Sequence, residues 1–246
     1  MIIYGINPVL EALRAGRVRE VRVGDRADDR LNRLLALAAD RGVRVRRVSK
    51  DVLERDSRRG VHQGVVADVE EGADYSVRDL VNDASPALIV VLDGIEDPHN
   101  LGAILRTADA AGVDGVIVQS RRSAARGGVA AKASAGAVAH VKVAEVVNVA
   151  RAVEELKEEN VWTVGLASDA TESYDAIDFT VPTAVIMGAE GTGLRRLVRE
   201  RCDRLASIPM RGHVTSLNVS VAAGVVLFEA IRQRSLGVLP GRRVRT

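Results

Sequence analysis

The sequence predicts an α/β protein in which a small amino-terminal α/β domain precedes a larger domain with a mostly parallel sheet. Helix-like and strand-like segments alternate along the whole chain, which is typical of this fold class. An almost uninterrupted apolar run, ALIVVLDGI at residues 87–95, has the composition of a parallel strand that is covered on both faces. Apolar residues become sparse over residues 70–86, where acidic residues, Gly, Ser and Pro accumulate, and this change predicts a linker.

These observations place the first domain at residues 1–72, the linker at residues 73–86 and the second domain at residues 87–246. Hydrophobic periodicity and turn-forming residues predict the elements within each domain. In the first domain we expect helices over residues 7–15, 29–40 and 51–55, and strands over residues 18–23, 43–48 and 61–69. In the second we expect strands over residues 87–95, 115–119, 141–143, 162–167, 184–187 and 205–208, and helices over residues 101–111, 147–159, 194–201 and 219–234.

The composition indicates a cytoplasmic protein with neither a membrane segment nor a disulfide. Hydrophobic residues make up 47% and charged residues 28% of the chain, as in ordinary globular proteins. Cys202 is the single cysteine, so the chain forms no internal disulfide. No apolar run has the length of a signal peptide or a membrane span. The histidines lack metal-ligand spacing, and we therefore expect no metal site.

Positive charge is concentrated in the first domain. Residues 1–72 contain 15 Lys or Arg against 12 Asp or Glu, whereas the rest of the chain has 20 against 21. Arginine, which suits bidentate phosphate contacts, supplies 31 of the 35 basic residues. The segment after residue 40 predicts either an RNA phosphate site or a solvated charged surface. The candidate RNA-binding residues of this basic cluster are Arg44, Arg46, Arg47, Arg58 and Arg59.

Ligands of parallel α/β sheets bind beyond the carboxyl ends of strands, and three segments that follow predicted strands carry candidate site residues. In the first, residues 93–113, we expect Asn100 to cap a helix and Arg106 to lie nearly two turns further along. A simple cap and a surface charge are the alternative interpretation.

The second segment, VIMGAEGTGL, surrounds Glu190 with glycines but lacks the Lys-Ser/Thr pair of a phosphate-binding loop. A neutral, nucleotide-like ligand fits it better, with Glu190 as a base or as an anchor of the turn through backbone amides. In the third segment, residues 208–233, we expect Thr215 or Ser216 to cap the last helix and Asn218 to lie in its first turn.

In their order and spacing, the three segments resemble the signature motifs of the SpoU branch of the SPOUT superfamily, the tRNA/rRNA 2'-O-ribose methyltransferases. The resemblance covers residues 88–232, and residues 132–141 also resemble this family. The opening YGINPVLEAL resembles the L30e-like RNA substrate-binding domain of the subgroup that modifies a guanosine of 23S rRNA. The matching residues are Asn100, Gly102 and Arg106; Gly188, Glu190, Gly193 and Leu194; and Ile208, Pro209, Met210, Gly212, Ser216, Leu217, Asn218, Val219, Ser220 and Ala222.

The resemblance implies a deep trefoil knot that forms the methyl-donor pocket, a homodimer, S-adenosylmethionine as donor, and RNA as substrate without a metal. In the family the motif-one arginine, here Arg106, activates the ribose hydroxyl. Because arginine is a poor base, we expect Arg106 to clamp the adjacent RNA phosphate and to stabilise the developing alkoxide, with a deprotonated Arg106 as the alternative. The other expected catalytic residues are Asn100, Glu190, Ser216 and Asn218. The expected donor-binding residues are Met187, Gly188, Glu190, Ile208, Met210, Ser216, Leu217 and Asn218.

Three other functions are alternatives to methylation of 23S rRNA. A nicotinamide-dependent oxidoreductase is disfavoured because the turn after residue 93 lacks the G-x-G-x-x-G fingerprint. Methylation of tRNA is compatible with the same motifs. A non-catalytic RNA-binding protein is disfavoured because all three motifs are intact.

Overall fold

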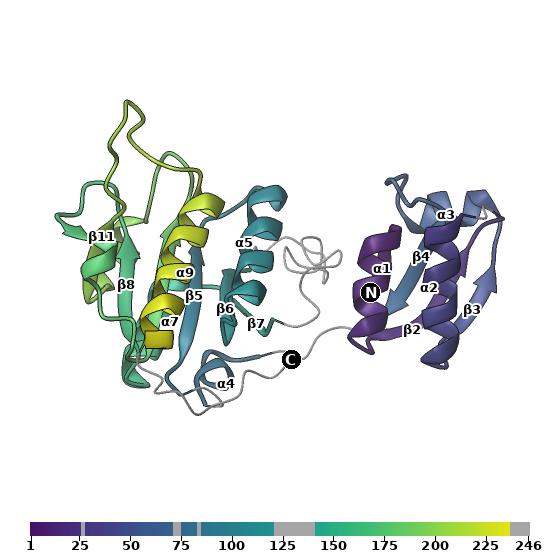
Figure 1. Cartoon of the computed structure of the whole chain (residues 1–246), viewed down its shortest axis with the longest axis horizontal. Coiled ribbons are helices and arrows are strands. Elements are labelled where there is room, and N and C mark those ends of the chain that lie inside the picture. The colour runs from purple at the N-terminus through teal and green to yellow at the C-terminus, as the bar shows by residue number, and fades with distance from the viewer. Residues whose placement is uncertain (26–27, 71–74, 83–84, 121–140, 237–246) are drawn as a thin grey trace. The chain divides into compact units, whose positions relative to one another are not determined.

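The computed structural model describes residues 1–25, 28–70, 75–82, 85–120 and 141–236 (Figure 1). The family-like stretch at residues 132–140 lies outside these ranges. The chain divides near residue 73 into two compact units, here called the first and the second unit. Among the described helices, none is long and apolar enough to cross a membrane.

The first unit is a mixed sheet with α1 (Ile6–Arg14) and α2 (Asp29–Asp40) packed on one face. In the described residues its strand order is β1-β4-β2-β3, with β4 antiparallel to both neighbours and β3 parallel to β2. Alternate strand residues such as Val21 and Val65 pack against Val9 and Leu34 of the helices. Its elements are β1 (Ile2–Tyr4), α1 (Ile6–Arg14), β2 (Val18–Val23), α2 (Asp29–Asp40), β3 (Arg44–Arg47), α3 (Lys50–Asp56) and β4 (Val65–Val69).

The second unit confirms the predicted mostly parallel α/β sheet. Its strand order in the described residues is β7-β6-β5-β10-β8-β11-β9, and each of these pairings is parallel. Every residue of β5 is buried, as expected for a strand covered on both faces. Its elements are α4 (Val77–Val81), β5 (Leu88–Asp93), α5 (Pro98–Ala110), β6 (Gly115–Gln119), β7 (Val143–Val146), α7 (Val149–Glu158), β8 (Trp162–Leu166), β9 (Glu172–Ser173), η1 (Tyr174–Ala176), β10 (Thr183–Gly188), α8 (Arg196–Arg201), β11 (Arg204–Ser207) and α9 (Val219–Leu236).

Helices cover both faces of this sheet. α5 and α9 pack against each other on one face, where Figure 1 shows them side by side. On the other face, Ile89 and Ile186 join one buried cluster with Val153 of α7 and Val198 of α8. Leu80 of α4 joins the same cluster, so the predicted linker contains a helix that packs into the second unit.

The start of α4 explains why a helix forms in a segment that is poor in apolar residues. The Ser76 hydroxyl accepts a hydrogen bond from Asp79 N, while the Asp79 carboxylate accepts one from Ser76 N, which is a capping box. Val77 and Leu80 bury the apolar face of this short helix. Sequence periodicity missed it because five residues are too few to show a helical repeat.

Arg234 fixes the end of α9 to the sheet. Its guanidinium donates hydrogen bonds to the carbonyl oxygens of Pro86 and Ala87 before β5, at 2.7 and 2.8 Å, and of Phe179 and Val181 before β10, at 2.8 and 3.1 Å. One side chain thus satisfies four backbone acceptors where two central strands begin. Its loss leaves these carbonyl groups without that donor.

We expect Arg234→Met to lower the free energy of unfolding of the second unit by about 3 kcal/mol, because it removes charged hydrogen bonds to partly buried carbonyl groups. Urea titrations followed by the fluorescence of Trp162, the single tryptophan, measure this unit. The control Arg196→Met removes an exposed pair with Glu200 on α8 and should cost less than about 1 kcal/mol. Equal losses in the two variants would contradict the role given to Arg234.

Candidate active site

Parallel pairing of β5 with β10 brings the first two motifs together. Asp93 at the end of β5 lies opposite Gly188 at the end of β10, although 94 residues separate these positions in the chain. From β5 the chain continues to β6 on one side of this strand pair, and from β10 it continues to β11 on the other side. Such a switch point is where open α/β sheets bind ligands, so the topology places both motif loops at the expected edge.

The turn after β10 folds back tightly. Ala189 and Gly193 exchange two backbone hydrogen bonds, of 3.1 and 2.8 Å, and Gly191 and Gly193 have φ values of +80° and +67°. A Cβ atom at Gly188 would overlap the backbone of Gly193 and Leu194. Gly188 is therefore required by the turn itself, whether or not a ligand approaches it.

Three polar side chains, one from each motif, meet beside this turn and form what we call the polar triangle. Asn218 Nδ2 donates to Asn100 Oδ1 at 3.0 Å and to Glu190 Oε1 at 3.3 Å. Asn100 Nδ2 donates to Glu190 Oε2 at 3.3 Å. Asn100 is buried, whereas Glu190 and Asn218 are exposed, so the triangle opens to solvent on one side.

The polar triangle leaves hydrogen-bonding capacity for a ligand. An ionised carboxylate has about four lone-pair sites, and the two asparagines occupy two of those on Glu190. Its remaining acceptor sites suit hydroxyl donors such as those of a ribose. Within the described residues Glu190 accepts hydrogen bonds from the side-chain amides of Asn100 and Asn218.

The helix caps differ from those predicted. Asp97, not Asn100, caps α5 by accepting a hydrogen bond from His99 N at 3.0 Å. Asn218 precedes α9, and its Oδ1 accepts from Ser220 N at 2.9 Å, in place of the predicted caps Thr215 or Ser216. Asn100 thus lies three residues after the cap of α5, inside the helix, and Asn218 lies directly before α9. From these positions their side chains meet.

In the described part of the chain, no hydrogen bond or ion pair joins Arg106 or Ser216 to the polar triangle. Both are exposed. Arg106 lies six residues after Asn100 on α5, which places it about 9 Å further along the helix and about 120° around it. Its guanidinium has no hydrogen bond or ion pair within the described residues and is available to an external anion.

The expected donor-binding residues follow β10 and β11. The Met187 side chain is buried in the core, so only its backbone can face a ligand. Ile208, Met210 and Leu217 are half-buried along the segment that joins β11 to α9. Asn218 ends this segment and connects it to the polar triangle.

Sequence analysis missed one ion pair of the site. Asp93 is fully buried, and its carboxylate accepts hydrogen bonds from Arg195 N at 2.8 Å and Arg195 Nε at 2.6 Å. This pair connects the end of β5 to the far end of the turn that carries Glu190. A carboxylate that ends an otherwise apolar strand was the available signal, because a buried charge requires a partner.

The described residues offer little to metal or thiol chemistry. They contain no group of three His, Cys, Asp or Glu side chains that could hold a metal ion. Burial raises the pKa of the Cys202 thiol to about 12, so it stays protonated at neutral pH and is a poor nucleophile.

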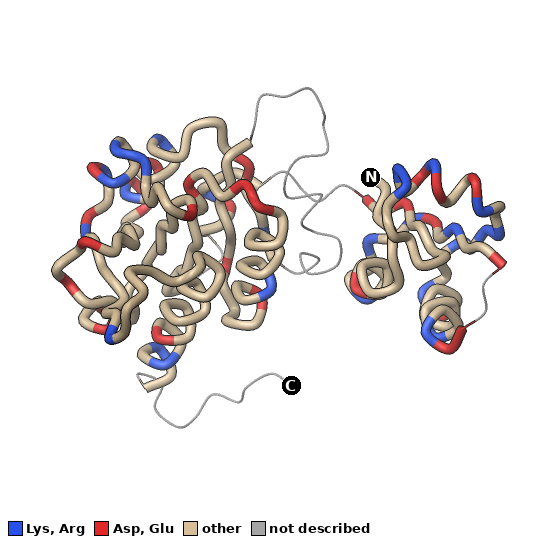
Figure 2. The backbone as a smooth tube through the Cα atoms, turned by 90° about the horizontal axis from the view of Figure 1, so that it is seen from above, with Lys and Arg blue, Asp and Glu red and all other residues tan. Residues whose placement is uncertain are grey.

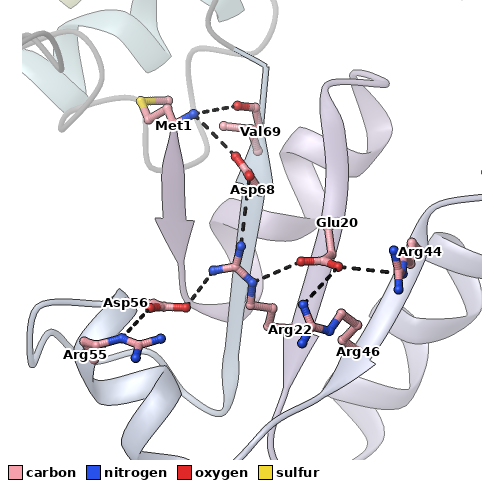
Figure 3. Close-up of polar contacts among 9 residues, drawn as sticks. All are labelled: Met1, Glu20, Arg22, Arg44, Arg46, Arg55, Asp56, Asp68 and Val69. Atoms are coloured by element: carbon pink, nitrogen blue, oxygen red, sulfur yellow. Dashed lines mark hydrogen bonds and ion pairs between the residues drawn. The ribbon is translucent and has the colours of Figure 1, made fainter.

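The basic cluster of the first unit is divided by its ion pairs. Arg44 and Arg46 lie on the edge strand β3, each 3.8 Å from Glu20, which also binds Arg22 (Figure 3). Both are more than half exposed, so these pairs are weak and leave the arginines accessible. Acidic and basic positions are interspersed through this unit (Figure 2).

The remaining members of the basic cluster are less neutralised. Among the described residues, the ion-pair partner of Arg47 is Asp25, at 4.0 Å, and that carboxylate is itself almost fully exposed. Arg58 and Arg59 are exposed and have no ion-pair partner within the described residues. These two arginines are therefore the members of the cluster that are best placed to bind an external anion.

Comparison with known sequences identifies relatives over nearly the whole chain. A protein of Yersinia pestis named 23S rRNA (guanosine-2'-O-)-methyltransferase RlmB is 47% identical over 241 residues, which cover 96% of this chain and 98% of the relative. The protein of the same name from Escherichia coli (strain K12) is 45% identical over 240 residues, which cover 95% of this chain and 99% of the relative.

Solved structures and family matches agree with these relatives. The SpoU methyltransferase AviRb from Streptomyces viridochromogenes, in complex with AdoMet, has a TM-score of 0.78 at 28% identity, covering 96% of this chain and 91% of that one. Residues 2–74 match the family described as RNA 2'-O ribose methyltransferase substrate binding. Residues 87–228 match the SpoU rRNA Methylase family. The chain therefore belongs to the SpoU rRNA methylase family, with an amino-terminal substrate-binding domain of the RNA 2'-O-ribose methyltransferases.

Proposed function

We propose that this chain transfers a methyl group from S-adenosylmethionine to the ribose 2'-hydroxyl of a guanosine in 23S rRNA. The polar triangle carries the proposal, because it joins one residue from each family motif at the switch point of the sheet. The names of the relatives from Yersinia pestis and Escherichia coli support the substrate. An rRNA substrate also supports the expected cytoplasmic location.

The residues of the site fit the methyl donor. S-adenosylmethionine supplies a methyl group already activated on a sulfonium. Its nucleoside part is uncharged, which suits a turn of glycines without a lysine, and Glu190 keeps free acceptor sites for ribose hydroxyl groups. The backbone at Gly188, Ile208, Met210 and Leu217 would hold the adenosine, while Asn100 and Asn218 keep Glu190 in place.

Arg106 is proposed to act on the RNA. Its exposed guanidinium is a permanent cation in water and can bind the phosphate next to the reacting ribose. The 2'-oxygen gains negative character as it loses its proton, and a nearby cation stabilises that charge. Ser216 is proposed to orient the same ribose. Exposure favours this electrostatic role over a deprotonated Arg106.

A homodimer is part of the same proposal. Val221 and Phe228 lie two turns apart on α9 and are 52% and 53% exposed, although Ala223 and Val226 of the same helix are buried. Large exposed apolar side chains on a helix support a second interface on its outer face. Sedimentation equilibrium at micromolar concentration should give twice the monomer mass, and a fully active monomer would contradict the dimer. The trefoil knot stays a prediction of the family resemblance.

The direct test uses labelled donor with unmodified 23S rRNA and unmodified tRNA. We expect transfer to 23S rRNA, with 2'-O-methylguanosine as the labelled nucleoside after digestion. Preferential transfer to tRNA would move the substrate to the alternative class. Tight rRNA binding without transfer would instead support a non-catalytic RNA-binding protein.

We expect Gly188→Ala to weaken donor binding at least about 10-fold while the second unit stays folded, because the added Cβ displaces the turn that positions Glu190. Calorimetric titration with S-adenosylmethionine measures this affinity. Gly224→Ala on α9, outside the motif residues, is the matched control, since a Cβ there makes only an ordinary van der Waals contact, 4.0 Å from Thr107. Unchanged affinity in a folded Gly188→Ala protein would remove this turn from the donor site.

Arg106→Ala should lower single-turnover methyl transfer by about 100-fold or more and leave donor affinity unchanged, because its charge acts on the reacting oxygen. Arg106→Lys should recover only part of the rate, since lysine keeps the charge but loses the planar fork. The control Arg151→Ala removes an exposed arginine that pairs with Glu155 on α7 and should retain the normal rate. Near-normal transfer by Arg106→Ala would shift the chemistry to Glu190 or Ser216.

A further inference from the structure

The loop that joins α3 to β4, residues 57–64, has an unusually strained backbone. Arg58, Arg59 and Gln63 have φ values of +52°, +61° and +51°, a region that side chains other than glycine rarely adopt. Backbone strain of this kind is retained where the surrounding structure enforces it, and it concentrates at functional sites.

Local contacts hold this loop in one conformation. Arg59 N donates to Glu54 O at 2.7 Å, and Gly60 N donates to Ser57 O at 3.0 Å. At the other end, Gln63 Oε1 accepts from Ile6 N at 3.0 Å. The loop is therefore built in advance of any ligand, which lowers the entropic cost of binding.

A surface pocket opens at this loop and is lined by Glu54, Arg59, Gly60 and His62. His62 Nδ1 accepts a hydrogen bond from Gly64 N at 3.1 Å, which leaves the ring hydrogen on Nε2 as a donor. Arg59 adds further donors, while the Glu54 carboxylate, whose Oε1 lies 3.5 Å from the exposed Lys50 ammonium, is an acceptor. The pocket thus combines one acidic acceptor with basic and neutral donors.

Apolar and aromatic groups flank the pocket. Val61 is 82% exposed, and Tyr4 is 38% exposed with its ring so close to Gly60 that a Cβ there would overlap it. Unpaired bases stack on aromatic rings and on guanidinium planes. A phosphate could bind Arg59 but would offer the Glu54 carboxylate no hydrogen-bond donor, whereas a base can offer one.

Guanine complements this pocket. Among the four bases, its Watson–Crick edge alone presents two adjacent N–H donors, which one carboxylate can accept, beside the O6 acceptor that His62 or Arg59 can contact. Pairing in a duplex would hide this edge. We infer that Glu54, Arg59 and His62 bind one unpaired guanine of the RNA substrate, outside the methyl-transfer site; this inference rests on the proposed function.

The test measures the affinity of the full chain, without methyl donor and at fixed salt, for hairpins that carry one bulged nucleotide. We expect the guanine bulge to bind at least about 10-fold more tightly than an adenine bulge or an inosine bulge. Inosine keeps the N1–H donor and O6 of guanine but lacks the second donor, the 2-amino group. Glu54→Gln should reduce this preference below about 3-fold, whereas Asp40→Asn, an exposed control on α2 with the same charge change, should keep it. The Glu54 side chain is 44% exposed, so the Glu54→Gln protein should fold normally. Thermal unfolding of both variants checks that a lost preference does not come from a folding defect.

Equal binding of guanine and adenine bulges by the unmodified chain would overturn the inference, as would a preference that survives Glu54→Gln. If the guanine preference were lost in Gly188→Ala but kept in Glu54→Gln, guanine recognition would belong to the methyl-transfer site instead. Guanine preference without methyl transfer to any RNA would contradict the proposed function and leave the pocket intact. Transfer without this preference would contradict the pocket alone.

Discussion

The site depends on the parallel pairing of β5 with β10 at the centre of the second sheet. This pairing places Asp93 opposite Gly188, so that the loops after the two strands start side by side. The buried Asp93–Arg195 pair then ties the far end of the second loop to the first strand. Asn100 and Glu190 can meet only because both ends of this turn are fixed, and Asn218 joins them from the segment that precedes α9.

Much of the fold was predictable because its elements carry strong local patterns. The structure has β2, α2 and β6 with the predicted bounds, and the almost uninterrupted apolar run that predicted a doubly covered strand contains β5. Short elements were missed: β1 and β9 have three and two residues, too few for a periodic signal. Each of them forms by pairing with a strand far away in the sequence, β1 with β4 and β9 with β11. Local sequence patterns do not indicate such pairing.

The candidate site was predictable as a set of residues but not as an arrangement. Capping rules assigned Asn100, and either Thr215 or Ser216, to helix ends, whereas Asp97 and Asn218 occupy those roles. Several polar residues near each helix start could cap it, and the local sequence does not distinguish them. In the folded protein, Asn100 and Asn218 also form hydrogen bonds to Glu190, which lies far away in the sequence. Gly188 matched the family motif, yet the structural reason for it, its contact with the backbone of Gly193 and Leu194, required the folded turn.

The central claim is that this site transfers a methyl group to a ribose oxygen. Once the labelled guanosine has been mapped, the most direct measurement compares transfer to that RNA with transfer to the same RNA carrying 2'-deoxyguanosine at this one position. We expect the single missing hydroxyl to abolish transfer while RNA affinity changes little. Transfer that continues at the deoxy nucleotide would show that the base is methylated and would contradict a ribose methyltransferase.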